Sequence, residues 1–127
     1  MTEANGNSAP LAGQRILIVE DEMLLAMDLE GVLESWGAQI LGPVPSIAKA
    51  LDVLAEDRPD LATLDINLSG ESSRSLAGEL KARDIPFVLI SGYSDAVSDD
   101  DTFKNASFVR KPYDERELLG AMEKLLS

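Results

Sequence analysis

Residues 15–21, RILIVED, place four consecutive branched apolar residues directly before two acidic ones. An unbroken apolar run of this length is typical of a strand that is buried on both faces, as the strands of a parallel sheet are. The sequence therefore predicts an internal strand whose end brings the carboxylates of Glu20 and Asp21 to the edge of a sheet.

Similar strand-like segments recur four more times, and helical segments lie between them. The further strands are predicted at residues 38–44, 61–64, 87–90 and 107–109. The helices are predicted at residues 22–36, 46–58, 73–83 and 114–127. Apolar residues at helical spacing support each helix, with Gly37 as a stop and with Ser46 and Asp114 as caps. A polar loop is predicted at 67–72, and the polar stretch 94–105 shows no clear pattern.

Five strands in alternation with helices predict one α/β domain, a doubly wound five-stranded parallel sheet with helices on both faces. In such a sheet the ligand site lies beyond the carboxyl ends of the strands, where the strand order reverses. A chain of 127 residues suffices for one such domain. We expect residues 1–13 to form a disordered tail and residues 14–127 to form the domain. Trp36, Met23 and Met27 are predicted to pack in the core.

The composition excludes several classes of function. The chain contains neither His nor Cys. This excludes disulfide bonds, zinc sites with His or Cys ligands, and catalytic nucleophile systems that need His or Cys. A balance of 11 basic and 23 acidic residues gives a net charge of −12, which repels nucleic-acid phosphates and anionic lipid head groups. No apolar run approaches the roughly 20 residues of a membrane span, and the N-terminus does not resemble a signal peptide. We therefore expect a cytoplasmic protein that binds neither nucleic acid nor a membrane.

Side chains suited to phosphoryl chemistry follow four of the five predicted strands. In chain order they are Glu20, Asp21, Asp65, Ser91 and Lys111. Because the carboxyl ends of parallel strands share one edge of the sheet, we expect these side chains to converge. Clustered carboxylates without His or Cys suit Mg²⁺, while a hydroxyl and an ammonium suit phosphoryl oxygens. One of the carboxylates can then attack phosphorus and form an acyl phosphate.

These motifs, in this order, resemble the receiver domain of two-component response regulators, and the resemblance extends from Arg15 to the C-terminus. It implies the five-stranded flavodoxin-like fold of receivers. In that family, the position of Asp65 accepts a phosphoryl group from a phosphohistidine on a sensor histidine kinase or a histidine phosphotransfer protein. The resemblance implies that the Ser91 hydroxyl binds this phosphoryl group and that the Lys111 ammonium pairs with it.

The resemblance also implies a magnesium site. Asp21 and Asp65 match metal ligands of the family, and Glu20 matches a residue that acts directly or through water. Asn67 matches a position that offers its backbone carbonyl. The implied function is signalling in a phosphorelay, by contact with a downstream protein or as a phosphate sink. Such a protein is not an enzyme, since it catalyses only its own phosphorylation and dephosphorylation.

Two segments are similar to one clade, the FAT GUY receivers. They are DINLSGE at residues 65–71 and PFVLISGY at residues 86–93, where Ser91 replaces the Thr of the named motif. The clade is common in alphaproteobacterial general stress and light signalling, often as single-domain proteins, and we expect this chain to work without a fused output domain. Phe108 keeps an aromatic at the ordinary switch position, so either Tyr93 or Phe108 is the expected mobile aromatic.

Two other functions compete with this interpretation. A toprim-like, Mg²⁺-dependent phosphotransfer enzyme needs a DxD motif after the third strand, but Asp65-Ile66-Asn67 lacks the second acid. A nucleotide-binding switch needs a GxxxxGK[ST] loop, and the chain has none.

We also predict that residues 94–105, the fifth strand and the last helix form a partner-binding surface, and that 94–105 is the least ordered part after the tail.

Overall fold

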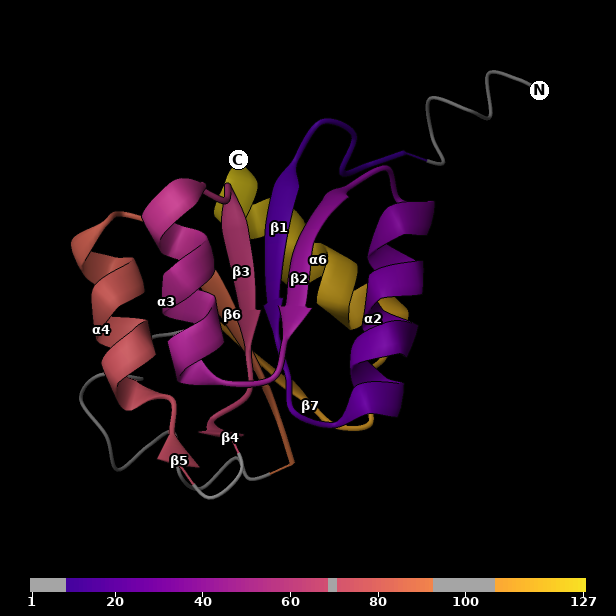
Figure 1. The fold of residues 1–127 in the computed structure, drawn as a ribbon. Helices are drawn as coiled ribbons and strands as arrows, with labels where there is room; N and C mark the ends of the chain where they lie inside the picture. Colours follow the sequence, from indigo (N-terminus) through magenta and orange to yellow (C-terminus); the bar gives the residue numbers. More distant parts are fainter. Residues whose placement is uncertain (1–8, 69–70, 93–106) are drawn as a thin grey trace.

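The computed structural model describes residues 9–68, 71–92 and 107–127, and it confirms the predicted α/β fold (Figure 1). Its main sheet consists of five parallel strands, β1 (Arg15–Val19), β2 (Gln39–Val44), β3 (Leu61–Leu64), β6 (Phe87–Ser91) and β7 (Ser107–Arg110). Their order in the sheet is β2-β1-β3-β6-β7. The strand order therefore reverses at β1, and the predicted site lies where β1 and β3 end side by side.

Helices cover both faces of the sheet, as predicted. The described helices are α2 (Met23–Ser35), α3 (Ile47–Glu56), α4 (Arg74–Ala82) and α6 (Glu115–Leu126). Figure 1 shows α3 and α4 on one face and α2 and α6 on the other. The bounds of these helices and of the five strands differ from the predicted ones by no more than two residues. No described helix is both long and apolar enough to cross a bilayer.

The strand β1 explains why its apolar run is unbroken. Ile16 and Ile18 belong to the core under α2 and α6, whereas Leu17 and Val19 belong to the core under α3 and α4. Each of these side chains is at most 1% exposed, because successive side chains of a strand point to opposite faces. The sheet is thus held between two apolar cores, and only the strand ends present polar groups.

The predicted caps are confirmed. Gly37 ends α2 with a φ of +95°, and a Cβ atom there would lie 3.0 Å from the Cα of Ala12, so only glycine fits without strain. The Ser46 side chain accepts a hydrogen bond from the backbone N–H of Lys49 at 3.2 Å. Asp114 accepts two backbone hydrogen bonds in the first turn of α6.

The predicted disordered tail is too long at its C-terminal end. Leu11 is only 1% exposed and belongs to the core under α2 and α6, against which Trp36 also packs. The backbone N–H of Leu11 donates to the carbonyl of Trp36 at 2.8 Å. One large apolar residue among small ones therefore anchors residues 9–13 to the domain. Residues 1–8 lie outside the described residues.

The predicted polar loop at 67–72 contains a small hairpin of β4 (Asn67–Leu68) and β5 (Glu71–Ser72). Leu68 is 1% exposed and packs into the core under α3 and α4, which holds this segment against the domain. The prediction for 94–105 lies outside the described residues.

The prediction that Met23 and Met27 pack in the core is wrong. Their side chains are 74% and 59% exposed, and Leu24 between them is 83% exposed. The buried residues of α2 are Ala26, Leu29 and Leu33. Because residues 23–27 are all apolar, their spacing does not reveal which face of the helix is buried.

We expect Leu11→Ala to lower the free energy of unfolding by about 2–5 kcal/mol, because it opens a cavity in a packed core. The matched control is Leu24→Ala, which removes the same atoms from an exposed position and should cost less than about 0.5 kcal/mol. Urea unfolding of both variants measures the difference. Equal effects would show that residues 9–13 do not belong to the folded domain.

Candidate functional site

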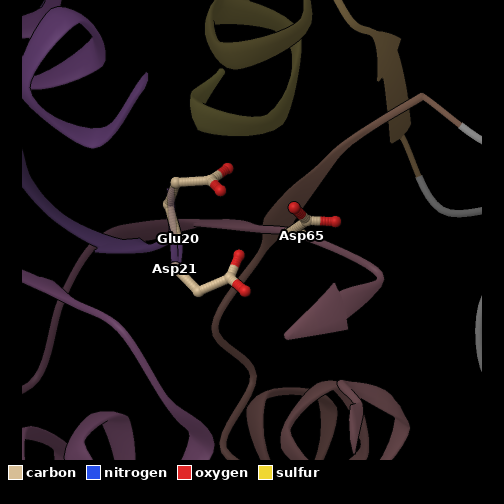
Figure 2. A group of neighbouring side chains, drawn as sticks. All are labelled: Glu20, Asp21 and Asp65. Atoms are coloured by element: carbon tan, nitrogen blue, oxygen red, sulfur yellow. The ribbon is translucent and has the colours of Figure 1, made fainter. Parts of the chain in front are cut away.

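Three carboxylates gather at the ends of two neighbouring strands. Glu20 and Asp21 follow β1, and Asp65 follows β3, as Figure 2 shows. Each offers one oxygen, and these oxygens all lie within 4.8 Å of one another. Glu20 and Asp65 are buried, at 5% and 7% exposure, while Asp21 is half-buried. The predicted convergence of these carboxylates is confirmed.

Lys111 completes the cluster. It directly follows β7, which is an edge strand of the sheet. Its ammonium Nζ lies 2.7 Å from Asp65 Oδ2 and 3.3 Å from Glu20 Oε1. The backbone N–H of Lys111 also donates to the carbonyl of Ser91 at 3.0 Å, which ties the loop after β7 to the end of β6. The strand ends therefore bring acids and a base from three separate parts of the chain into direct contact.

Burial and hydrogen bonding have opposite effects on the pKa values of Lys111 and Glu20. Burial alone would lower the pKa of Lys111, but hydrogen bonds with Asp65 and Glu22 outweigh it and raise that pKa above the ordinary value. Burial raises the pKa of Glu20, and the charge of Asp65 adds to this rise, whereas the backbone N–H of Glu22 lessens it. The ammonium is thus held firmly charged, while the buried carboxylates lack enough positive charge to balance them.

The donor set fits a hard divalent cation. Glu20, Asp21 and Asp65 offer oxygen ligands and no nitrogen or sulfur, and oxygen ligands are what Mg²⁺ prefers. Lys111 alone cannot neutralise these acids together with Glu22 beside it. A cation bound among the three carboxylates would supply the missing charge.

The remaining predicted site residues have different placements. Ser91 ends β6 and is 1% exposed. Asn67 begins β4, and its proposed carbonyl ligand role stays a prediction. Phe108 in β7 is half-buried and packs against the core under α3 and α4. Tyr93 lies outside the described residues, so the identity of the switch aromatic also stays a prediction.

Two contacts between α2 and the loop after β7 were not predicted. The Glu22 carboxylate lies 3.0 Å from Lys111 Nζ, although the sequence suggested only that Glu22 starts a helix. The Tyr113 hydroxyl donates to the Asp28 carboxylate, and burial together with this hydrogen bond raises the pKa of Tyr113. The partners lie 89 and 85 residues apart, and no local pattern links them.

A groove adjoins the acidic cluster. It has a volume of about 290 Å³ and lies between the first turns of α2 and the end of β2. Its lining residues include Glu20, Asp21, Met23, Met27, Pro43 and Pro45. Met23 and Met27 thus lie beside Glu20 and Asp21. Leu24 follows Met23 directly in the helix, and we call the exposed side chains of Met23, Leu24 and Met27 the α2 patch.

Comparison with known proteins identifies the family. A family model described as the response regulator receiver domain matches residues 16–123. The chain belongs to the response regulator receiver family. This receiver is 32% identical over 114 residues to the phyllosphere-induced regulator PhyR of Methylorubrum extorquens, a match that covers 87% of this chain and 43% of that protein. The chain spans less than half the length of the first curated relatives it matches.

Solved receivers share the fold. The receiver domain of Erythrobacter litoralis PhyR superposes with a TM-score of 0.83 at 27% identity, over 91% of this chain and 92% of that one. SdrG from Sphingomonas melonis Fr1 gives a TM-score of 0.78 at 42% identity, over 90% of this chain and 97% of that one. The resemblance to receivers of alphaproteobacteria is therefore confirmed, and the toprim-like alternative has no support. Receivers of this family are signalling proteins of two-component systems.

We expect Mg²⁺ to stabilise this receiver against unfolding by about 2.7 kcal/mol when its concentration is 100 times the dissociation constant. Asp21→Asn should lose most of that gain, because it removes one ligand of the cluster. Without the metal the variant should be at least as stable as the wild type, since it relieves repulsion among crowded carboxylates. Thermal unfolding with and without Mg²⁺ measures both effects.

The matched control for this experiment is Asp52→Asn, which makes the same change on an exposed face of α3. It should respond to Mg²⁺ as the wild type does. An Asp21→Asn protein that keeps the full response would contradict the assignment of Asp21 as a ligand.

Proposed function

We propose that this receiver accepts a phosphoryl group on Asp65 from a phosphohistidine of a sensor histidine kinase or a histidine phosphotransfer protein, in a Mg²⁺-dependent reaction. The observation that carries the proposal is the contact of 2.7 Å between Lys111 Nζ and Asp65 Oδ2, beside two further carboxylates. A buried carboxylate paired with an ammonium and lying near a cation site is suited to phosphoryl transfer.

The proposed reaction conserves all atoms. A carboxylate oxygen of Asp65 attacks phosphorus, a P–O bond forms, and the P–N bond to the donor imidazole breaks with its electron pair passing to nitrogen. The Lys111 ammonium then stabilises the negative charge of the phosphoryl oxygens. The Ser91 hydroxyl, at the end of the neighbouring strand, is proposed to donate a hydrogen bond to the same group.

Magnesium is proposed to be held by Asp21 and Asp65, by Glu20 directly or through water, and by the backbone carbonyl of Asn67. When bound, it would neutralise charge on the phosphoryl oxygens. The protein's own contribution is to hold the acceptor carboxylate rigidly at a strand end, where the surrounding backbone is paired in the sheet.

The phosphoryl donor is proposed to be a separate protein, because this chain contains no His to carry a phosphoryl group. The α2 patch supports this proposal. Three large apolar side chains stand exposed at the start of the helix that follows the acidic pair. Exposed apolar groups of this size gathered in one place are typical of protein interaction sites. A donor protein that covers them would bring its phosphohistidine to the edge of the sheet.

The output of this receiver is proposed to be contact with a downstream protein or withdrawal of phosphoryl groups from a kinase. It is not proposed to turn over a separate substrate. The net charge of −12 supports a protein partner over nucleic acid or an anionic membrane. The cytoplasmic location and the partner-binding surface around residues 94–105 stay predictions.

Asp65→Asn should abolish the gain of a phosphoryl group from acetyl phosphate and Mg²⁺, because the amide is a poor nucleophile and forms no acyl phosphate. Intact mass measurement checks this, and Asp52→Asn is the control that should gain the group at the wild-type rate. An Asp65→Asn protein that is phosphorylated at the normal rate would refute the proposed acceptor.

Leu24→Ala should slow phosphoryl transfer from a cognate protein donor by about tenfold, through loss of apolar contact at the interface. Transfer from acetyl phosphate should not change, because the side chain is 83% exposed and a small donor needs no docking surface for a protein. Leu51→Ala, at the exposed Leu51 of α3, is the control and should leave both rates unchanged. Equal slowing with both donors would argue against the α2 patch as the docking site.

A further inference from the structure

Glu22 is a carboxylate at the site to which the proposed reaction gives no role. It follows the pair of Glu20 and Asp21 directly, and its Oε1 atom lies 3.0 Å from Lys111 Nζ. Lys111 therefore contacts three carboxylates, on Asp65 at 2.7 Å, on Glu22 at 3.0 Å and on Glu20 at 3.3 Å. An ammonium has three N–H donors, so these three partners suffice to occupy all of them.

The three contacts differ in their surroundings. The side chains of Glu20 and Asp65 are 4% and 8% exposed, whereas that of Glu22 is 65% exposed. A charge pair with an exposed partner is weakened by water and by salt, and its side chain can turn away at little cost. Glu22 is therefore the partner that Lys111 can exchange most readily.

A phosphoryl group on Asp65 would present three acceptor oxygens and nearly two negative charges to Lys111, in place of the one negative charge that the Asp65 carboxylate now carries. Those oxygens and the carboxylate of Glu22 require the same ammonium. If Glu22 stays in place, its charge also repels the incoming phosphoryl group. In both cases the ion pair between Glu22 and Lys111 disfavours the phosphorylated state.

We infer that Glu22 competes with the phosphoryl group for Lys111 and so lowers both the rate at which Asp65 is phosphorylated and the stability of the phosphorylated state. This inference rests on the proposed function. It makes Glu22 a positioning residue, which acts through Lys111 and sets how readily this receiver responds to its donor.

A second contact keeps the local structure intact when Glu22 is displaced. The hydrogen bond from Tyr113 to Asp28 joins α2 to the same loop and does not involve Lys111. The backbone hydrogen bond from Lys111 to Ser91 holds the other side of that loop. Removing the charge of Glu22 should therefore change the reaction without releasing Lys111 from the site.

The test is Glu22→Gln, which keeps the size of the side chain and removes its charge. At saturating Mg²⁺ and low ionic strength, about 0.01 M, acetyl phosphate should phosphorylate the variant about three to ten times faster than the wild type. Near 1 M ionic strength the two rates should approach each other, because the contact is exposed and salt screens it. Intact mass measured over time gives both rates.

The matched control is Glu34→Gln, which makes the same change of charge at an exposed position near the other end of α2. It should keep the wild-type rate at both ionic strengths. A second readout is the affinity for beryllofluoride, a phosphoryl mimic, measured by calorimetry with Mg²⁺. Glu22→Gln should bind the mimic more tightly by a similar factor, and Glu34→Gln should not.

The outcomes separate the two proposals. If the wild type is phosphorylated and Glu22→Gln reacts at the same rate or more slowly, the inference about Glu22 is overturned while the proposed function stands. A similar acceleration in Glu34→Gln would also overturn it, because the effect would then reflect net charge alone. If none of the proteins gains a phosphoryl group, the proposed function itself fails.

Discussion

The ion pair between Lys111 and Asp65 depends on strands of matched length in one parallel sheet. Asp65 follows β3 and Lys111 follows β7, and β6 lies between those strands. The two residues meet because all three strands end at the same edge. The ammonium of Lys111 in turn lowers the repulsion among the buried and half-buried carboxylates that lie together there. The two apolar cores hold the strands in this register, so packing beneath the sheet determines the geometry of the charges above it.

Because the site lies at the ends of parallel strands, much of it could be predicted from the sequence. Apolar runs show where strands lie, and the first polar residue after each run shows where the strand ends. These local patterns sufficed to place Glu20, Asp21, Asp65 and Lys111 together. The resemblance to receivers added the roles of these residues, which spacing alone does not provide.

Other features depend on contacts that no local pattern contains. Glu22 and Lys111 are 89 residues apart, and their contact follows from how α2 leaves β1. Leu11 is a single large apolar residue between small ones, and its burial depends on a space beside Trp36 that only the folded domain forms. The α2 patch escaped prediction because its apolar residues are consecutive. These exposed side chains form part of the surface, although an apolar run of this kind is typical of a core segment.

We propose above that Asp65 is a phosphoryl acceptor assisted by Lys111 and a bound cation. A crystal structure of this receiver grown with Mg²⁺ and beryllofluoride tests it most directly. We expect beryllium bonded to a carboxylate oxygen of Asp65, Lys111 Nζ hydrogen-bonded to a fluorine, and Mg²⁺ among Glu20, Asp21 and Asp65. A structure in which Asp65 carries no beryllium, and Lys111 keeps its contacts with Glu20 and Glu22, would show that Asp65 is not the acceptor.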